Sequence, residues 1–412
     1  MVINKPEVTE SGDKICVSAR IEIQTPDRTC PDTLWFKFPK SYSDYITDRT
    51  DPFAASLLPL AMRYGENLEI HGLLSPRLAH GMQEYLRIQH LWKPDEFKLM
   101  EINCTNLKTN NPTRIAGGVG CAFSGGVDSF HTLWSHLPQN EKNPGYRISH
   151  CLMINGFDLN SIPEDAETFS NKTRHLYEPM MNRLGLQLLV SHTNIWQFLD
   201  KTKWKRFMYI FGSILTASAL TFGHLFSRFY IASSFQYTQL FPWGSHPLLD
   251  NLLSTETTEI IHDGAHLTRI EKMAALSQWP ETYSRLRTCL FDISFINKTA
   301  RLENCCRCER CIQAMSVLDM LGVLDKYTVF PKPLERKHVR KVDFINIPEK
   351  GKYKYLYARE TIDSAHKMGR RDVVFDLSYA ILRNIWLKGR IKKVGRPIKR
   401  IFKKILKAYR DG

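Results

Sequence analysis

Apolar and polar residues follow two different patterns along the chain. Over residues 1–115, segments with the alternation of strands are mixed with segments that have the spacing of helices. The predicted strands are 17–23, 33–38 and 97–104, and the predicted helices are 52–64 and 75–90. These patterns predict a small α+β leading domain over residues 1–115, in which we find no catalytic motif.

Residues 116–300 instead alternate strand and helix in a regular way. Short apolar strands are predicted at 119–123, 148–154, 186–191 and 229–232, with helices at 130–137, 166–184 and 207–226 between them. Strands that alternate with helices form a parallel sheet covered by helices on both faces. We therefore predict a doubly wound, mostly parallel α/β domain over residues 116–330, whose ligands bind at the carboxyl ends of the strands.

The helix predicted at 207–226 belongs to a stretch, residues 207–227, that contains no Asp, Glu, Lys or Arg. The stretch is long enough to cross a bilayer. Its glycine, serine, threonine and histidine residues make insertion less favourable, and small residues suit close packing against a sheet. We expect a buried helix rather than a membrane span.

The sharpest local signal is a glycine-rich loop between a predicted strand and a predicted helix. Two adjacent glycines allow a tight turn and a close approach of the backbone to a ligand. The start of the following helix offers free N–H groups and a positive dipole end, which bind phosphate oxygens. A Walker A loop would have Gly-Lys-Ser/Thr here, and this chain does not. The residues of the loop are Ser124, Gly125, Gly126, Val127, Asp128 and Ser129.

This loop resembles the PP-loop of the N-type ATP pyrophosphatases, Ser-Gly-Gly-x-Asp-Ser, in both sequence and context. The resemblance implies an adenine nucleotide alpha-hydrolase-like fold and cleavage of ATP to AMP and pyrophosphate. It also implies that residues 124–129 bind the pyrophosphate end of ATP, together with Mg²⁺. In that family an oxygen of the substrate is adenylated, and a nucleophile then displaces AMP.

A cysteine-rich segment follows the predicted sheet. Cys305, Cys308 and Cys311 are spaced two residues apart, which allows a tight turn to present several thiolates to one metal ion. Cys289 is the natural fourth ligand of a tetrahedral zinc site, and Cys306 is a spare cysteine. An iron–sulfur cluster and a redox or sulfur-carrying pair are the alternatives.

A PP-loop followed by a four-cysteine zinc knot resembles 7-cyano-7-deazaguanine synthase-like proteins over residues 116–315. That family converts a carboxylate to a nitrile through an adenylate and an amide, with ATP and ammonia. This chain departs from the pattern at Cys306, where the resemblance leads us to expect glycine, and at residues 155–158. It also adds the leading domain and a basic tail. We therefore carry over the ATP chemistry and the zinc, and not the nucleobase substrate.

Residues 242–272 are predicted to line the acceptor pocket, because they are rich in turns, aromatic residues and histidine. Lys272 resembles the lysine of a late helix in the synthase family, and Lys272 and Arg269 are candidate catalytic cations that can stabilise phosphate charge. The alternative is that both lie on a solvated helix face. Asp128 is a candidate for orienting the loop or approaching a metal ion. Asp158, at the end of the second strand, is a candidate for binding the ATP ribose or the substrate.

Charge is distributed unevenly along the chain. Lys and Arg exceed Asp and Glu by 15 overall, yet residues 1–330 have a net charge of −1 and residues 331–412 a net charge of +16. From residue 391, apolar residues recur at helical spacing among lysines and arginines, which predicts a basic amphipathic helix at the end of the tail. We expect this tail to bind an anionic membrane surface or an acidic partner. Nucleic acid is less favoured, and a helix packed on the protein itself is a further alternative.

These features predict an ATP-dependent adenylating enzyme, a ligase or synthase that forms a C–N bond on an activated carboxylate or similar oxygen of a small-molecule acceptor. The expected cofactors are ATP, Mg²⁺ and Zn²⁺. The N-terminal residues lack the apolar run of a secretory signal, so we expect a cytoplasmic protein, with peripheral membrane association through the tail as one alternative. Two other functions stay open: sulfur transfer to a tRNA base, and a non-catalytic nucleotide-binding scaffold.

Overall fold

The computed structural model describes residues 1–24, 30–109, 116–155, 166–198, 208–289, 303–344 and 355–387. Asp158 and the amphipathic helix predicted from residue 391 lie outside these ranges. The chain divides into two compact units. The first contains Met1–Ser124 and Asp128–His266, and the second contains Gly125–Val127 and the described residues from Leu267 onward.

The first unit is built on an eleven-stranded, mostly parallel sheet with the order β11-β10-β7-β8-β9-β4-β3-β1-β5-β6, and β2 pairs with β3 outside this path. Its strands are β1 Val2–Ile3, β2 Glu7–Ser11, β3 Lys14–Glu22, β4 Thr33–Pro39, β5 Leu68–Ile70, β6 Ile102–Cys104, β7 Gly118–Ala122, β8 His150–Asn155, β9 Gln187–Thr193, β10 Phe226–Ala232 and β11 Glu259–Asp263. The prediction of an α/β chain with a mostly parallel sheet is confirmed.

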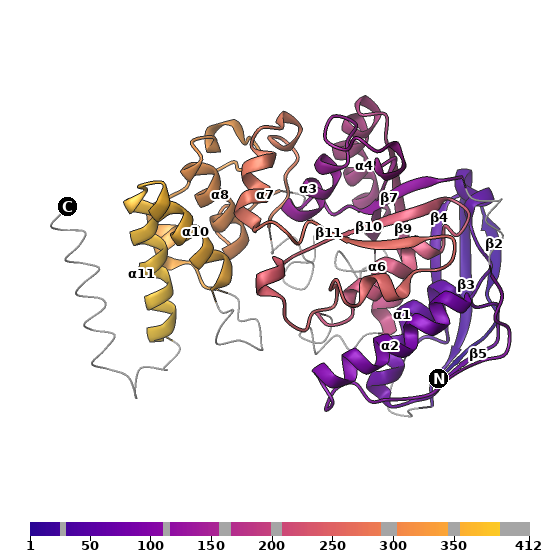
Figure 1. Cartoon of the computed structure of the whole chain (residues 1–412). Helices are drawn as coiled ribbons and strands as arrows, with labels where there is room; N and C mark the ends of the chain where they lie inside the picture. The colour runs from indigo at the N-terminus through magenta and orange to yellow at the C-terminus, as the bar shows by residue number, and fades with distance from the viewer. Residues whose placement is uncertain are drawn as a thin grey trace. The chain divides into compact units, whose positions relative to one another are not determined.

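The five strands from β7 to β11 are all parallel to their neighbours, and helices cover them on both sides. In Figure 1, α3 (Val127–Ser135) and α4 (Ala166–Arg183) lie on one side of this part of the sheet, and α6 (Phe211–Leu220) lies on the other. Central strands covered on both faces need apolar residues at consecutive positions. The buried run Cys151, Leu152, Met153 and Ile154 of β8 meets this requirement.

The helix predicted at 207–226 is shorter in the structure, where α6 ends at Leu220 and β10 begins at Phe226. Nearly every residue from 212 to 226 is buried, so the pattern of apolar residues does not indicate where the helix ends and the strand begins. Within α6, the buried Ser218 Oγ bonds to the carbonyl of Ile214 in the same helix at 3.1 Å. Among the described residues, no helix is both long enough and apolar enough to cross a membrane.

The leading segment adds antiparallel strands and two helices to the same sheet. β4 pairs with β9 at Phe36↔Thr193 and Lys37↔His192. The helices α1 (Asp51–Tyr64) and α2 (Pro76–Trp92) lie on the same side of the sheet as α6 (Figure 1). The domain boundary at residue 115 stays a prediction; the sheet itself runs from the leading strands into the parallel ones through β4 and β9.

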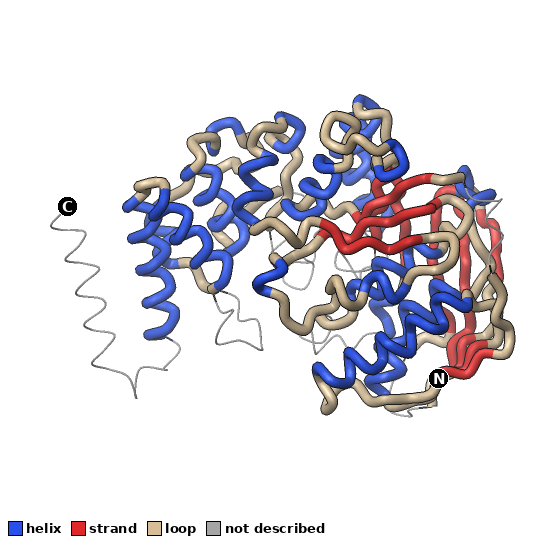
Figure 2. Tube along the Cα trace, in the orientation of Figure 1, coloured by secondary structure: helices blue, strands red, loops and turns tan. Residues whose placement is uncertain are grey.

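The described part of the second unit is helical (Figure 2). Its helices are α7 Arg269–Leu276, α8 Glu309–Met320, α9 Arg336–Lys341, α10 Leu356–Lys367 and α11 Arg371–Leu387. Short 3-10 helices in the two units are Lys40–Tyr45, Pro144–Tyr146, Ile195–Phe198, Tyr237–Gln239, Asp250–Leu253, Pro280–Thr282 and Leu324–Lys326. Three of the helices therefore lie in the region that the sequence marks as a basic tail.

Ion pairs connect the helices of this region. Arg336 lies 2.7 Å from Asp372, and Arg340 lies 2.6 Å from Asp376, whose side chain is almost completely buried. Arg370 bridges to Asp319 of α8 at 2.5 Å. Some of the arginines after residue 331 therefore form ion pairs within the protein, and these pairs connect α8, α9 and α11.

Candidate functional site

The loop between β7 and α3 follows the strand at which the sheet changes direction. From β7 the chain moves through β8 and β9 on one side, and then returns to place β10 and β11 on the other side of β7. In open parallel sheets, ligands bind beyond the carboxyl ends of the strands at such a switch point. The glycine-rich loop begins immediately after β7, so topology alone places it at the expected ligand edge.

Residues 124–129 fold into a compact turn. Gly125 has a φ of +73°, a left-handed conformation that would cost a residue with a Cβ about 1–2 kcal/mol. Ser124 N donates to Ser129 Oγ at 3.2 Å, and the two hydroxyl oxygens also lie 3.2 Å apart. Ser124 is exposed whereas Gly125, Val127 and Ser129 are buried. The exposed end of the loop can therefore bind an anion at the start of α3.

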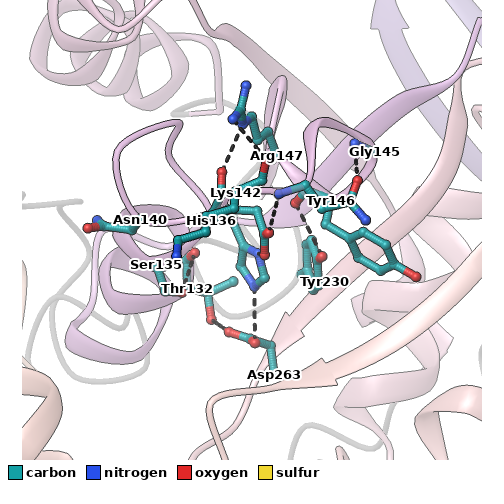
Figure 3. Close-up of polar contacts among 12 residues, drawn as sticks. Thr132, Ser135, His136, Asn140, Lys142, Gly145, Tyr146, Arg147, Tyr230 and Asp263 are labelled. Carbon is teal, nitrogen blue, oxygen red and sulfur yellow. Dashed lines mark hydrogen bonds and ion pairs between the residues drawn. The ribbon is translucent and has the colours of Figure 1, made fainter.

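Helix α3 is anchored to the last strand of the sheet by one carboxylate (Figure 3). Thr132 Oγ1 donates to Asp263 Oδ2 at 2.7 Å, and His136 Nε2 lies 3.2 Å from Asp263 Oδ1. The His136 ring stacks on Tyr230 with a centroid separation of 4.0 Å. Burial alone would raise the pKa of Asp263, but the hydrogen bond and charge of His136 hold it below its usual value. This anchor fixes the helix that follows the loop.

The four cysteines selected from their spacing come together. One ligand atom from each lies within 4.8 Å of the others, and Cys289, Cys308 and Cys311 are buried while Cys305 is partly exposed. Cys305 Sγ lies 3.9 Å from Cys311 Sγ, and Cys308 Sγ lies 4.0 Å from Cys289 Sγ. None of the ten cysteines, all of which are described, forms a disulfide bond.

This geometry fits a tetrahedral metal ion. A zinc ion bound to four thiolates at its usual bond length separates the sulfur atoms by about 3.8 Å. The backbone N–H groups of Cys308 and Cys311 point to the sulfurs of Cys305 and Cys308, at 3.3 and 3.5 Å. The cluster can thus hold a metal ion such as zinc.

Cys306 has a left-handed backbone, with a φ of +57°. Its side chain is buried, and its Sγ donates to Asn304 O at 3.5 Å. Glycine is the residue that adopts this conformation without strain. The structure therefore explains in physical terms why glycine was expected at this position.

A buried asparagine joins the segments of the cluster. Asn304 Oδ1 accepts hydrogen bonds from Thr288 N at 2.8 Å and from Thr288 Oγ1 at 3.2 Å. Its amide nitrogen donates to Leu286 O at 2.9 Å and to Val329 O at 3.3 Å. Asn304 immediately precedes Cys305, so it fixes the segment before Cys289 against the turn that carries the other three cysteines.

The same segment reaches the glycine loop. Arg287 N donates to Gly125 O at 2.8 Å, and both residues belong to the second unit. Arg287 lies two positions before Cys289. Gly125 of the glycine-rich loop and the cysteine cluster are far apart in the sequence. They are therefore linked by one backbone hydrogen bond, to Arg287, and by the two residue steps from Arg287 to Cys289.

The two candidate cations, Arg269 and Lys272, lie on α7, which begins with a capping box between Thr268 and Glu271. The Arg269 guanidinium lies over the ring of Tyr357, 5.2 Å from its centroid, at a hollow that Arg310 also lines. Lys272 is only 2% exposed and contacts other groups of the protein. A solvated face is thus excluded for Lys272, and its catalytic role stays a prediction.

Residues 243–262 form a buried polar cluster in the first unit. Asp250 Oδ2 accepts from Ser245 Oγ at 2.6 Å and lies 2.7 Å from His262 Nδ1. The Nε2 atom of His262 is buried and has no hydrogen-bond partner among the described residues. Burial lowers the pKa of His246 to about 4. The structure brings these residues together with the N-terminal end of α6, because Gly212 N donates to Gly244 O at 2.9 Å.

The sequence alone gives little indication that several residues of these sites have a role there. Asp263 lies within the segment predicted to line the acceptor pocket, and its pairing with α3 depends on the sheet order. Asn304 precedes the cysteine motif and resembles any polar residue of a turn. Arg287 acts through its backbone, which no side-chain pattern reports.

The chain was also compared with known proteins. Searches against protein-family models, curated protein sequences and solved structures found no match.

Proposed function

We propose that the chain is an ATP-dependent adenylating enzyme that releases pyrophosphate and activates a carboxylate, or a similar oxygen, for C–N bond formation on a small molecule. The observation that carries the proposal is the loop 124–129 at the switch point of the parallel sheet, with Gly125 in a left-handed conformation and α3 directly behind it. The resemblance to the PP-loop of ATP pyrophosphatases and their doubly wound fold supports the same proposal.

In this proposal the loop binds the β- and γ-phosphates of ATP. The N-terminal end of α3 supplies N–H groups and a positive dipole, and the hydroxyls of Ser124 and Ser129 add polar contacts. Asp128, in the first turn of α3, is proposed to hold Mg²⁺ on the phosphates. Asp158 keeps its proposed role near the ribose or the substrate, outside the described residues.

The proposed reaction has two steps. A carboxylate oxygen of the acceptor attacks the α-phosphorus, the bond to the bridging oxygen breaks, and pyrophosphate leaves. A nitrogen nucleophile then attacks the carbonyl carbon of the adenylate, AMP leaves with the bonding electron pair, and the nitrogen loses a proton. Arg269 and Lys272 are proposed to stabilise the negative charge that develops on the phosphate oxygens.

We propose that zinc occupies the four-cysteine cluster as a structural ion. All four candidate ligands are cysteines, and a site closed by four protein ligands leaves no position for a substrate. A sulfur carrier would instead need a labile thiol. Retention of one zinc per chain and resistance of the four cysteines to alkylation would argue against the sulfur-transfer alternative.

The tail is proposed to bind an anionic membrane surface, with an acidic protein partner as the alternative. Residues 388–412 contain eleven Lys and Arg residues and one acidic residue. Such a segment is attracted to anionic lipids by about 1 kcal/mol for each basic residue near the surface. The protein would then be cytoplasmic and peripheral at the membrane.

A pyrophosphate-release screen tests the enzymatic proposal. The full chain is incubated with ATP, Mg²⁺, ammonium and a library of carboxylates, and pyrophosphate and AMP are measured together. The expected result is equimolar pyrophosphate and AMP with a matching acceptor, and loss of both products in Asp128→Ala. Formation of ADP and phosphate by the wild-type chain, in place of AMP and pyrophosphate, would refute the proposal.

A further inference from the structure

The cysteine cluster and the phosphate loop are joined through three consecutive residues. Arg287 binds the carbonyl of Gly125, Thr288 binds Asn304 through two donors, and Cys289 is a candidate metal ligand. The Thr288 hydroxyl also lies 3.7 Å from Cys311 Sγ. These three residues are consecutive in the chain. A displacement of Cys289 is therefore transmitted to Gly125 through only two residues, Thr288 and Arg287.

The bond at Gly125 sets the orientation of one peptide group in the loop. A trans peptide is planar, and its carbonyl and N–H point in opposite directions. When Arg287 N holds the carbonyl of Gly125, it therefore also fixes the direction of the N–H of Gly126. Glycine does not restrict this orientation by itself, because its backbone has more freedom than that of any other residue.

A metal ion determines where Cys289 lies. Cys305, Cys308 and Cys311 belong to one short turn, whereas Cys289 lies 16 residues before Cys305 in the chain. Without a metal, weak thiol contacts of 4.0 Å and the hydrogen bonds of Asn304 hold the two segments together. Metal–thiolate bonds are much stronger, and their binding free energy adds directly to local folding.

We propose that Thr288 and Asn304 are positioning residues that couple metal occupancy of the cysteine cluster to the conformation of the phosphate loop. The chain then binds nucleotide phosphates tightly only when the cluster holds its metal. This inference rests on the proposed function, because it assumes that residues 124–129 bind ATP.

A matched pair of threonine variants tests the coupling in the metal-loaded chain. Thr288→Val removes the hydroxyl that bonds to Asn304 and keeps the size of the side chain. Thr282→Val makes the same change at another buried threonine of the second unit, whose hydroxyl bonds to Trp279 O and the Tyr327 hydroxyl. The Kd for ATP with Mg²⁺ is measured by calorimetry, zinc content is measured on the same samples, and KM and kcat follow where turnover is found.

We expect Thr288→Val to weaken ATP binding about 3- to 10-fold and to raise KM more than it lowers kcat. Thr288→Ser, which keeps the hydroxyl, should restore the affinity. Thr282→Val should change the affinity less than 2-fold even if it lowers the melting temperature. Equal losses of affinity in Thr288→Val and Thr282→Val would overturn the inference, because they would show a general effect of stability.

Removal of the metal provides a second test of the coupling. The full chain is stripped with a chelator under reducing conditions and reloaded with zinc, and ATP affinity and amide hydrogen exchange of residues 124–129 are followed. We expect at least 10-fold weaker binding and faster exchange after stripping, both reversed by zinc. Unchanged affinity in protein shown to lack metal would refute the coupling alone, whereas loaded wild-type protein that does not bind ATP would refute the proposed function itself.

Discussion

The two units of the molecule are stabilised in different ways. The first is organised around a long sheet, and many of its buried residues form an apolar cluster that includes strands from the leading segment and from the parallel half. The described part of the second unit consists of helices that pack buried apolar residues such as Met315 and Leu377, and it adds a four-cysteine cluster, a buried asparagine and arginine–aspartate pairs. The comparison predicts that loss of a metal destabilises the second unit directly, because the cysteine cluster lies in that unit.

Loss of a metal ligand should have the largest effect. In Cys308→Ala the cluster keeps three thiols, so we expect zinc content to fall below one per chain and the second unit to unfold first on heating. Structural zinc contributes about 10 kcal/mol or more in small domains, so the loss should exceed that of any other single change described below. Zinc analysis and hydrogen exchange of α8 report the result.

Cys306→Gly is the matched control for that variant. It removes a neighbouring thiol and introduces the residue that fits a φ of +57°. We expect full zinc content, and a change in the free energy of unfolding within about 1 kcal/mol, because relief of strain offsets the loss of a buried side chain. Loss of zinc in Cys306→Gly would contradict the assignment of Cys306 as a spare cysteine.

Substitution of a buried aspartate in the second unit should have the next largest effect on stability. Asp376 is almost completely buried and bonds to Arg340, so Asp376→Asn leaves a weaker, uncharged acceptor. We expect the second unit to lose about 2 kcal/mol. Asp343→Asn is the control, since Asp343 is exposed and pairs with Arg383 at the surface, where such pairs contribute about 0–1 kcal/mol. Equal effects of both variants in denaturant unfolding would contradict the distinction.

The first unit also has charged anchors, and one of them is Asp263. Hydrogen bonds hold its pKa below the usual value, so its contribution to stability is present above the unfolded-state pKa and is lost as the pH falls through the folded-state pKa. Asp263→Asn should lower stability by about 1–2 kcal/mol near neutral pH and remove this acid-dependent part. Thermal unfolding between pH 7 and pH 3 measures both. A steeper acid dependence in the variant than in the wild type would refute the assignment.

Deletion of residues 388–412 should have the smallest effect on the folded units. The proposed ATP chemistry uses none of these residues, so pyrophosphate release on a soluble substrate should stay within about 2-fold of wild type. Binding to vesicles of anionic lipid should be lost, because the deleted segment carries most of the basic excess. Loss of turnover would show that the tail belongs to the catalytic part.

The sequence predicted the features that arise from local pattern. The strands at 119–123, 148–154 and 186–191 lie within two residues of β7, β8 and β9, and the four cysteines were selected from spacing alone. The boundary between α6 and β10 could not be predicted, because the helix and the strand are both buried at nearly every position. The hydrogen bond between Arg287 and Gly125 could not be predicted either, since backbone groups are the same in every residue.

The pairing of β4, in the leading segment, with β9 could not be predicted from local sequence pattern either. Strand β4 has the regular alternation of buried and partly buried residues, which predicts a strand but does not name its neighbour. Its partner β9 follows only after the glycine loop and the four helices α1, α2, α3 and α4. Partner choice depends on which apolar edges remain unpaired in the assembled sheet, and that is a property of the whole unit.

The pairing of β4 with β9 has a consequence for synthesis of the protein. Lys37 pairs with His192, which the ribosome adds 155 residues later. At ordinary elongation rates the edge of β4 therefore waits roughly 8–30 s for its partner. During that interval an unpaired, half-apolar strand is exposed on the nascent chain, and such an edge is a site for aggregation. A chaperone that shields this edge should therefore improve the yield of folded protein, whereas slower translation, which lengthens the interval, should lower it.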